Sequence, residues 1–293
     1  MTSTSATFRF APSPNGALHL GHAYSALFTA QMAKQHNGRF LLRIEDIDLE
    51  RSKPEYEQQI YDDLAWLGLS WEQPVRRQSQ HFNDYRQALD QLIDMGLVYP
   101  SFASRSEIKT QAQKAGIDHD PDGQFLYPEA CKAQDQEKAT APGAMNTPHA
   151  WRLDMKHAIA KAKQINTGAL NFMELGEGPD NETGLLTLTP DIWGDVVIAR
   201  KDVPTSYHLS VVVDDALQAI THVTRGQDLF YATHIHRLLQ VLLRLPQPIY
   251  HHHGLIRDET GRRLAKSAQD QSLQALRNQG CTHQDIFKLV GLS

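Results

Sequence analysis

The apolar run at Phe40–Ile44 constrains the fold more than any other feature, because a near-continuous apolar run is typical of a strand buried on both faces. An earlier short strand is predicted over residues 8–10, where two phenylalanines flank an arginine shortly before a turn cluster. The helical composition of residues 21–36 stops at Asn37 and Gly38, with the glycine as the expected residue just past the helix cap. Strand, helix and strand at this spacing form a βαβ unit, which predicts a parallel sheet.

Patterns later in the chain predict further elements. Helices are expected over 52–68, 82–96 and 228–243, and strands at 196–198, 209–213 and 220–223. The first of these helices should begin with a capping box, Ser52-Lys53-Pro54-Glu55. Residues 132–149 are rich in Ala, Gln, Lys and Pro, so we expect loop or disorder there.

Composition places the chain among globular proteins of about two domains, with 293 residues of which 41% are hydrophobic. The net charge of −5 argues against a general nucleic-acid coat protein, although a local basic face can still meet a specific RNA. Cys131 and Cys281 cannot form a disulfide framework, and no apolar run approaches the ~20 residues that span a membrane. The N-terminal segment lacks the pattern of a secretory signal, so a cytoplasmic location is expected.

Two histidines stand where the first helix begins. His19 and His22 lie three residues apart and share a helix face, beside the unpaired N–H groups and positive dipole end that attract phosphate. Gly21 lets a nucleotide approach the backbone closely. The alternative is a helix cap that carries two surface histidines.

A second candidate is the loop Gly261–Ser267, in which Lys266 lies close to Arg262 and Arg263. A lysine on a mobile loop suits a clamp that closes on phosphate in a transition state. The alternative is a solvated basic loop, which is the commoner outcome for such a cluster.

Together these segments resemble the class I aminoacyl-tRNA synthetases, because His19–His22 is similar to their HIGH motif and Leu264–Ser267 to the second half of KMSKS. Further segments resemble the glutamyl and glutaminyl branch and occur in its order. They are Arg9–Gly16, Arg43–Asp48, Tyr207–Asp215 and Thr221–Asp228. The resemblance implies an α/β fold: a Rossmann-like class I synthetase catalytic domain with an inserted α+β subdomain.

The resemblance also implies roles for single residues. The glutamate-binding residues would be Arg9, Ala11, Ser13, Glu45, Tyr207 and Arg225. Guanidinium groups pair with carboxylates in a fork, and Glu45 would supply a negative charge for the substrate ammonium. The ATP-binding residues would be His19, Gly21, His22 and Lys266, of which His19, His22 and Lys266 would be catalytic. ATP is then a substrate, and Mg²⁺ is expected on its pyrophosphate with no protein ligand assigned.

The chain ends 26 residues beyond Ser267, whereas glutamyl-tRNA synthetases continue into a large anticodon-binding region. In this respect it is similar to the glutamyl-queuosine tRNA(Asp) synthetases, which lack that domain. They activate L-glutamate with ATP and esterify it to the queuosine base in the anticodon of tRNA(Asp). The implied partners are L-glutamate, ATP and queuosine-containing tRNA(Asp), without a membrane, and we expect tRNA-independent activation by a monomer.

Two alternatives remain open. The same activation chemistry can serve a different acceptor, such as a tRNA 3′ end or a non-RNA amine. A catalytically silent paralogue that binds tRNA or nucleotide as a regulator is the other, although His19, His22 and Lys266 count against it.

Only half of a zinc site typical of the glutamyl-queuosine family is present. Tyr127 and Cys131 match its second half, whereas Ser101 and Ala103 replace two cysteines. Structural zinc normally needs four ligands, so zinc is not expected unless His119 or His149 substitutes. Residues 251–253 are consecutive histidines on an expected strand, and their side chains would point to alternate faces rather than to one ion.

The resemblance finally suggests domain boundaries. We expect the Rossmann-like catalytic domain over 1–100 and 195–250, and an inserted acceptor-binding-like subdomain over 101–194. Residues 251–293 should hold the KMSKS-like loop and C-terminal helices.

Overall fold

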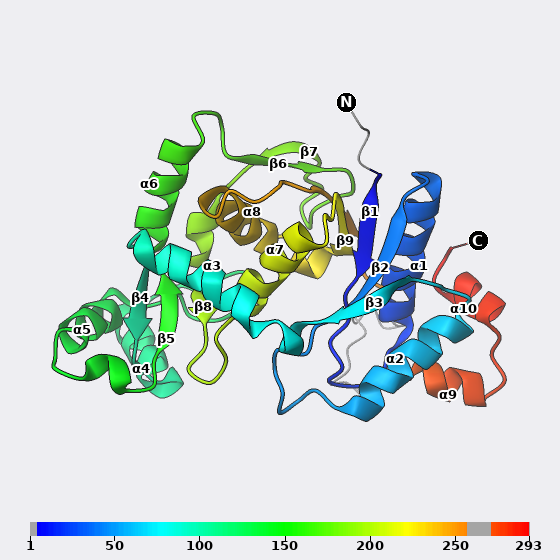
Figure 1. Cartoon of the computed structure of the whole chain (residues 1–293), viewed down its shortest axis with the longest axis horizontal. Helices are drawn as coiled ribbons and strands as arrows, with labels where there is room; N and C mark the ends of the chain where they lie inside the picture. The colour runs from blue at the N-terminus through cyan, green and yellow to red at the C-terminus, as the bar shows by residue number, and fades with distance from the viewer. Residues whose placement is uncertain (1–4, 257–270, 293) are drawn as a thin grey trace.

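The computed structural model describes residues 5–256 and 271–292 (Figure 1). The predicted βαβ unit is confirmed: β1 (Thr7–Phe10), α1 (Leu20–Gln35) and β2 (Arg39–Ile44) follow one another, and β1 and β2 pair in parallel. β3 (Glu72–Arg77) adds a third parallel strand on the far side of β2. This three-stranded sheet is one half of the region expected to form the catalytic domain.

The predicted stop of α1 needs a correction in its detail. Asn37, with a φ of 47°, is the left-handed residue, and Gly38 is not among the glycines with positive φ. Gly38 is required for a different reason, since a Cβ there would collide with the carbonyl oxygen of Ala6. Asparagine tolerates the left-handed region better than most residues, so it can end the helix.

A second sheet forms the other half, with strands β6 (Asn171–Glu174), β7 (Gly184–Thr187), β9 (His222–Gly226) and β10 (Ile249–His253) in the order β7-β6-β10-β9. It lies beside β1, because the Thr221 amide donates to the Thr7 carbonyl at 3.0 Å and the Thr7 amide to the Thr221 hydroxyl at 2.8 Å. The two halves therefore meet between β1 and β9, and the carboxyl ends of these strands face the same edge.

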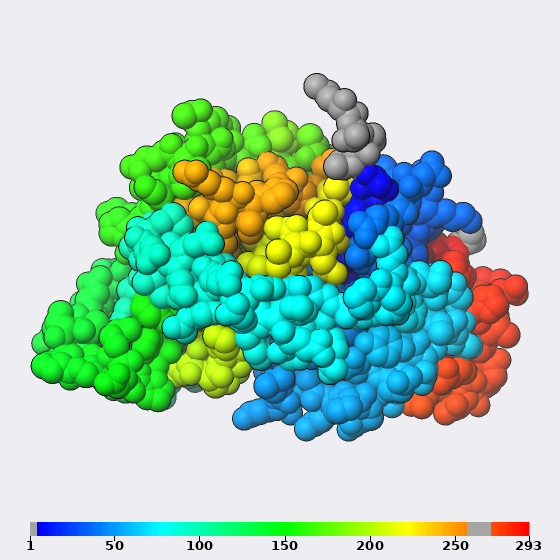
Figure 2. Space-filling model, in the orientation of Figure 1, coloured from blue at the N-terminus to red at the C-terminus, as the bar shows by residue number. Residues whose placement is uncertain are grey.

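Two hydrophobic clusters pack helices against these halves. The larger one joins α3 (Phe82–Asp94), α6 (Met155–Ile165), α7 (Tyr207–Leu217) and α8 (Ala232–Leu242) to the second sheet. The smaller one joins α1 and α2 (Pro54–Trp66) to α9 (Leu273–Asn278) and α10 (His283–Leu289). In Figure 2 the segment around α3 and β3, in cyan, crosses the visible face between the N-terminal half and the green segments.

The inserted subdomain is built on an antiparallel sheet of β4 (Val98–Ser101), β5 (Ala150–Leu153) and β8 (Val197–Ala199), in that order. It also carries α4 (Arg105–Ala115) and α5 (Glu129–Ala139), and it lies at the opposite end of the molecule from α9 and α10 (Figure 1). Four short 3₁₀ turns complete the described elements: Gln78–Gln80, Ala144–Asn146, Pro190–Trp193 and Gln227–Leu229.

Strand pairing cuts across the expected domain boundaries. β6, inside the segment 101–194, pairs with β10 of the catalytic sheet, while β8, outside that segment, pairs with β5 of the insert. The chain therefore leaves and re-enters the insert more than once. Within the described residues, each helix is too short or too polar to cross a membrane.

Three local predictions are wrong. Residues 209–213 were expected as a strand but belong to helix α7, and residues 132–149 include most of helix α5. Helix α2 begins at Pro54 with Lys53 as its N-cap and no side-chain capping bond, so the capping box from Ser52 does not form. The helices ending before Gly68 and Gly96 are confirmed, and both glycines have positive φ.

Candidate functional site

Two adjoining pockets lie at the carboxyl ends of β1, β2 and β9, where ligands bind in open α/β sheets. The smaller, of about 510 Å³, is bounded by β1, the start of α1, β9 and the end of β10. The larger, of about 770 Å³, lies between the catalytic half-sheets and the insert. The two pockets share Ser13, Asn15, Glu45 and Tyr207, so a ligand in one contacts the walls of the other.

The predicted site residues converge on the smaller pocket. Its lining includes Arg9, Ala11, Ser13, His19, Gly21, His22, Glu45, Tyr207 and Arg225. These residues come from β1, the turn after it, α1, the end of β2, α7 and β9. Lys266 lies outside the described residues, as does the rest of its loop.

His19 and His22 form a reciprocal cap at the start of α1. The Gly21 amide donates to His19 Nδ1 at 3.1 Å, and the His19 amide donates to His22 Nδ1 at 3.2 Å. Both Nδ1 atoms therefore act as acceptors, so each neutral ring carries its proton on Nε2. A Cβ at Gly21 would lie 3.0 Å from the His19 ring, which explains why glycine suits this position. The helix-cap alternative thus describes real contacts, and both histidines also line the pocket.

Arg9 is held by a buried acidic partner rather than left open to the pocket. Its Nε lies 2.9 Å from Asp215 Oδ1, and its Nη1 donates to the Thr224 carbonyl at 3.3 Å. Asp215 also accepts from Arg43 Nη1 at 2.7 Å. Burial would raise the pKa of Asp215, but Arg9 and Arg43 hold it below its ordinary value. Arg9 therefore presents a fixed positive charge at the pocket wall.

Two acidic residues among those described line this pocket, Glu45 and Asp228, and Glu45 is the one predicted to meet the substrate. It accepts from Arg43 Nη2 at 3.0 Å and stays mostly buried. Burial raises the pKa of Glu45, although Arg43 and Arg9 act in the opposite direction. A substrate ammonium against this carboxylate would add a further positive neighbour and favour its ionised form.

Arg225 has a different environment. Its side chain is 5% exposed, and its three polar neighbours are the Nε2 of His252 at 3.0 Å, Nδ1 of His236 at 3.0 Å and Oγ1 of Thr233 at 2.7 Å. No ion pair in the described part of the chain includes Arg225. A buried guanidinium whose neighbours are neutral is a natural partner for a carboxylate from a ligand.

Helix α7 brings Tyr207 to the shared wall. Ser206 caps the helix by accepting from the Leu209 amide, and Tyr207 and His208 follow in its first turn. Burial raises the pKa of Tyr207, so its hydroxyl remains protonated at neutral pH. Ala11 and Ser13 lie on the turn after β1 and complete this side of the smaller pocket.

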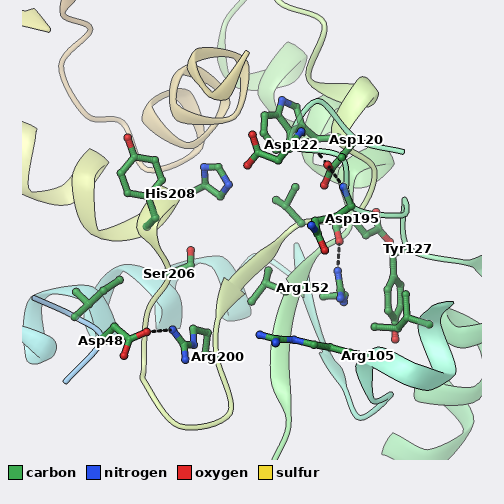
Figure 3. A pocket seen from close by; sticks show the side chains of 18 of the residues that line it. Asp48, Arg105, Asp120, Asp122, Tyr127, Arg152, Asp195, Arg200, Ser206 and His208 are labelled. Carbon is green, nitrogen blue, oxygen red and sulfur yellow. Dashed lines mark hydrogen bonds and ion pairs between the residues drawn. The ribbon is translucent and has the colours of Figure 1, made fainter. Parts of the chain in front are cut away.

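The larger pocket has charged walls of both signs (Figure 3). From the catalytic side come Asp48, Ser206 and His208, and Asp48 pairs with Arg200 at 3.2 Å. From the insert come Arg105, Asp120, Asp122, Tyr127 and Arg152, whose side chains surround the same space. These side chains offer hydrogen-bond donors and acceptors to a polar ligand of about the size of a nucleoside.

The sequence analysis did not identify the buried residues that support the side chains of the site. Asp214 lies at the end of α7 and accepts from Arg76 Nε at 2.7 Å, Gln78 Nε2 at 2.8 Å and the Tyr85 hydroxyl. Asp214 and Asp215 were part of the segment that resembles the synthetases, but no role was assigned to them. The signal that could have found them is two consecutive acidic residues after an unbroken apolar run.

The half zinc site forms a hydrogen-bonded cluster. Tyr127 bonds Ser101 Oγ at 2.8 Å and donates to Asp135, and the Phe102 amide donates to Asp135 Oδ1 at 2.8 Å. Cys131 is buried nearby on α5, and burial raises the pKa of its thiol. Within residues 5–256 and 271–292, no three His, Cys, Asp or Glu side chains are grouped to hold a metal ion.

Comparisons with known proteins found a matching family and similar relatives. The profile of the family described as tRNA synthetases class I (E and Q), catalytic domain, matches residues 5–293. A Glutamyl-Q tRNA(Asp) synthetase of Rhodobacter capsulatus is 47% identical, over 97% of this chain and 99% of its own length. A glutamate–tRNA ligase of Aquifex aeolicus is 35% identical over 97% of this chain, but the match spans 56% of that ligase.

A solved structure is also similar. It is a glutamate tRNA ligase from Elizabethkingia meningosepticum in complex with its amino acid, which superposes with a TM-score of 0.68 at 26% identity. The superposition covers 90% of this chain and 52% of that ligase. The chain thus spans nearly all of the first relative and about half of the ligases that it matches.

Proposed function

We propose that this chain, which belongs to the family of class I tRNA synthetase catalytic domains of the glutamate and glutamine branch, activates L-glutamate with ATP and transfers it to the queuosine base of tRNA(Asp). The use of ATP follows from membership of this family. The observation that supports the acceptor is the 47% identity to a Glutamyl-Q tRNA(Asp) synthetase along 99% of its length, against 35% for a glutamate–tRNA ligase.

The smaller pocket supports glutamate as the amino acid. Arg225 offers a guanidinium whose neighbours are neutral, Arg9 adds a fixed positive charge, and Glu45 lies in the same wall. A molecule with carboxylates at both ends and one ammonium group matches these three charges. We assign one carboxylate to Arg225 and the ammonium to Glu45.

In the first step, an oxygen of the glutamate α-carboxylate attacks the α-phosphorus of ATP, and pyrophosphate leaves with the electrons of the broken P–O bond. A carboxylate is ionised at neutral pH, so the step needs no general base and depends on positioning and charge stabilisation. His19 and His22 line the smaller pocket at the start of α1, and a helix N-terminus attracts phosphate oxygens. Lys266 would act on the same phosphates.

Mg²⁺ would enter with the nucleotide. We assign the ion to the phosphates of ATP, which are the usual partners of Mg²⁺ at such sites. When bound, the ion neutralises charge on the leaving pyrophosphate. The residues of this chain then hold and orient the two substrates around it.

In the second step, a hydroxyl of the queuosine ring attacks the carbonyl of the adenylate, forming an ester while AMP leaves and the hydroxyl proton passes to solvent. We place the acceptor in the larger pocket, because it shares Ser13, Glu45 and Tyr207 with the smaller one. The insert and the Asp48–Arg200 pair would bound this acceptor.

The proposal predicts glutamate-dependent ATP–pyrophosphate exchange without any tRNA. Glutamate should then appear on tRNA(Asp) that carries queuosine and not on the same tRNA without it. A tRNA(Asp) whose 3′-terminal adenosine has been removed should still accept glutamate, because the base is the acceptor.

The contrary outcomes are distinct. Exchange that appears only after tRNA is added would place the chain with conventional glutamate–tRNA ligases. Glutamate on the 3′ end of any tRNA, lost when the terminal adenosine is removed, would overturn the acceptor. Absence of exchange under all these conditions would favour a silent binding protein.

A further inference from the structure

A chain of buried polar groups connects β6 to the larger pocket through Arg225. Its members, in order, are Glu174, His252, Arg225, His236 and His208. The successive contacts are 2.6 Å, 3.0 Å, 3.0 Å and 3.2 Å long. Glu174 and His252 are 1% exposed and His236 is 2% exposed, so solvent cannot replace these contacts. His208 reaches the edge of the larger pocket (Figure 3).

The protonation pattern of this chain follows from Arg225, since a guanidinium can only donate. The Nε2 of His252 and the Nδ1 of His236 face it and must therefore accept, which makes both rings neutral. The proton of His252 is then on Nδ1, where Glu174 accepts it, and the proton of His236 is on Nε2, toward His208 Nδ1. Every bond in the series has one donor and one acceptor.

The surroundings keep both rings in this neutral form. Burial lowers the pKa of His236 well below its ordinary value, and the nearby Arg225 lowers it further. Burial also lowers the pKa of His252, to about 4, although Glu174 acts in the opposite direction. At neutral pH both imidazoles are thus acceptors for the guanidinium.

These two acceptors fix the orientation of the Arg225 guanidinium. The described residues use three of its five N–H groups, through His252, His236 and Thr233. We propose that His252 and His236 are positioning residues, which lock Arg225 so that its two remaining N–H groups meet a carboxylate of glutamate in the smaller pocket. The inference rests on the proposed function, because it takes Arg225 as a glutamate ligand.

The test is ATP–pyrophosphate exchange with His236→Leu and His236→Asn. The leucine removes the acceptor beside Arg225, so the glutamate KM should rise roughly 10- to 100-fold, the usual effect of losing a hydrogen bond to a charged group. The ATP KM should change less than twofold. Asparagine places Oδ1 near the former Nδ1 and should restore most of the glutamate affinity, although it cannot continue the chain to His208.

His234→Leu is the matched control. His234 is on the same helix, is 5% exposed, and accepts from the Thr189 amide at 3.0 Å, away from Arg225. Its loss should lower the melting temperature without separating the two KM values. His252→Gln, which keeps an oxygen near Arg225, supplies a second variant if His236→Leu does not fold.

The outcomes separate the two proposals. An active wild type with an unchanged glutamate KM in His236→Leu would overturn the positioning role alone, as would equal losses in the leucine and asparagine variants. A wild type with no glutamate-dependent exchange would overturn the proposed function and this inference together. His252→Gln keeps an acceptor beside Arg225, so its glutamate KM should stay close to that of the wild type. If His236→Leu does not fold, a rise in glutamate KM above 100-fold in His252→Gln would overturn the positioning role.

Discussion

Arg225 and Arg9 are both predicted to bind a carboxylate of glutamate, yet their surroundings in the fold differ. Arg9 pairs with Asp215, which it shares with Arg43, so a counter-ion inside the protein already offsets part of its positive charge. Among the described residues Arg225 has only neutral partners. A buried charge without a counter-ion is costly, and a ligand carboxylate relieves that cost. Glutamate affinity should therefore depend more on Arg225 than on any other residue of the pocket.

Arg225→Leu should raise the glutamate KM by about 100-fold or more while the ATP KM changes little, because a charge-assisted, bidentate contact is lost. Exchange kinetics at varied glutamate and ATP measure both constants. Arg237→Leu is a suitable control, since Arg237 is a buried arginine on α8 that donates to the Asn171 carbonyl at 3.1 Å. Equal changes in both KM values for Arg225→Leu would show a structural role instead.

Single residues of the site were the easiest part to predict. The nine predicted residues that the structure describes all line the smaller pocket, although their roles stay predictions. These residues could be predicted because short motifs link a residue type to a position in the chain. The supporting partners could not be predicted in this way. His252 and Asp214 act through contacts between residues 27 and 136 positions apart, and His236 meets Arg225 only because α8 packs beside β9.

At the scale of elements, α7 shows how burial overrides local preference. Its Val211-Val212-Val213 run favours a strand by intrinsic propensity. All three valines are buried, Ser206 caps the helix, and the two acidic residues that follow reach arginines on β1, β2 and β3. A helix that is apolar on most sides is a buried helix, which a single sequence cannot distinguish from a buried strand over so few residues.

The contact between α2 and α9 contains an acid whose ionisation opposes folding. Asp63 is 1% exposed, and its Oδ2 has no hydrogen-bond partner within the described residues. Burial raises its pKa to about 6, Arg277 on α9 lowers it, and the neighbouring Asp62 raises it. Because the folded pKa is above the unfolded one, the favourable contribution is complete below about pH 4. It is lost as the pH rises through about 6.

Asp63→Asn cannot ionise, so it should stabilise the protein at pH 8 by on the order of 1 kcal/mol and have little effect at pH 4. Melting temperatures of both proteins at the two pH values measure this difference. Glu55→Gln is the control, because Glu55 is exposed on the same helix, whereas the neighbouring Asp62 itself raises the pKa of Asp63. A gain from Asp63→Asn that is equal at both pH values would contradict the titration argument.

At the scale of the whole molecule, the insert depends on contacts that the sequence only partly indicated. The cluster of Ser101, Tyr127 and Asp135 joins β4 to α5, and Lys132 bridges Asp154 and Asp195 at 2.9 and 2.8 Å. The sheet order was also beyond prediction, because the return of β6 to the catalytic sheet depends on pairing with β10 across 76 residues. Periodicity finds strands, but it does not say which strands pair.

Purified protein should contain much less than one equivalent of zinc after dialysis against a mild chelator, and a strong chelator should leave its melting temperature unchanged. The physical reason is that Tyr127 and Cys131 cannot close a tetrahedral site. Tyr127→Phe should destabilise the insert by about 1–2 kcal/mol, since it leaves the buried Asp135 without that donor. Stoichiometric zinc that survives dialysis, with a melting temperature that falls under chelation, would mean that other residues, such as His119 or His149, rebuild the site.

The position of β1 between the two half-sheets has a consequence for the order in which the protein can assemble during synthesis. Residues 7–10 leave the ribosome early, and β2 can cover one of their edges after about thirty more residues. The other edge waits for residues 221–226, since the Thr7 and Thr221 contact joins positions 214 residues apart. Until then, the strand that ends at the ligand pockets has an unpaired edge, and nascent chains stalled before that point are the ones most exposed to wrong pairing.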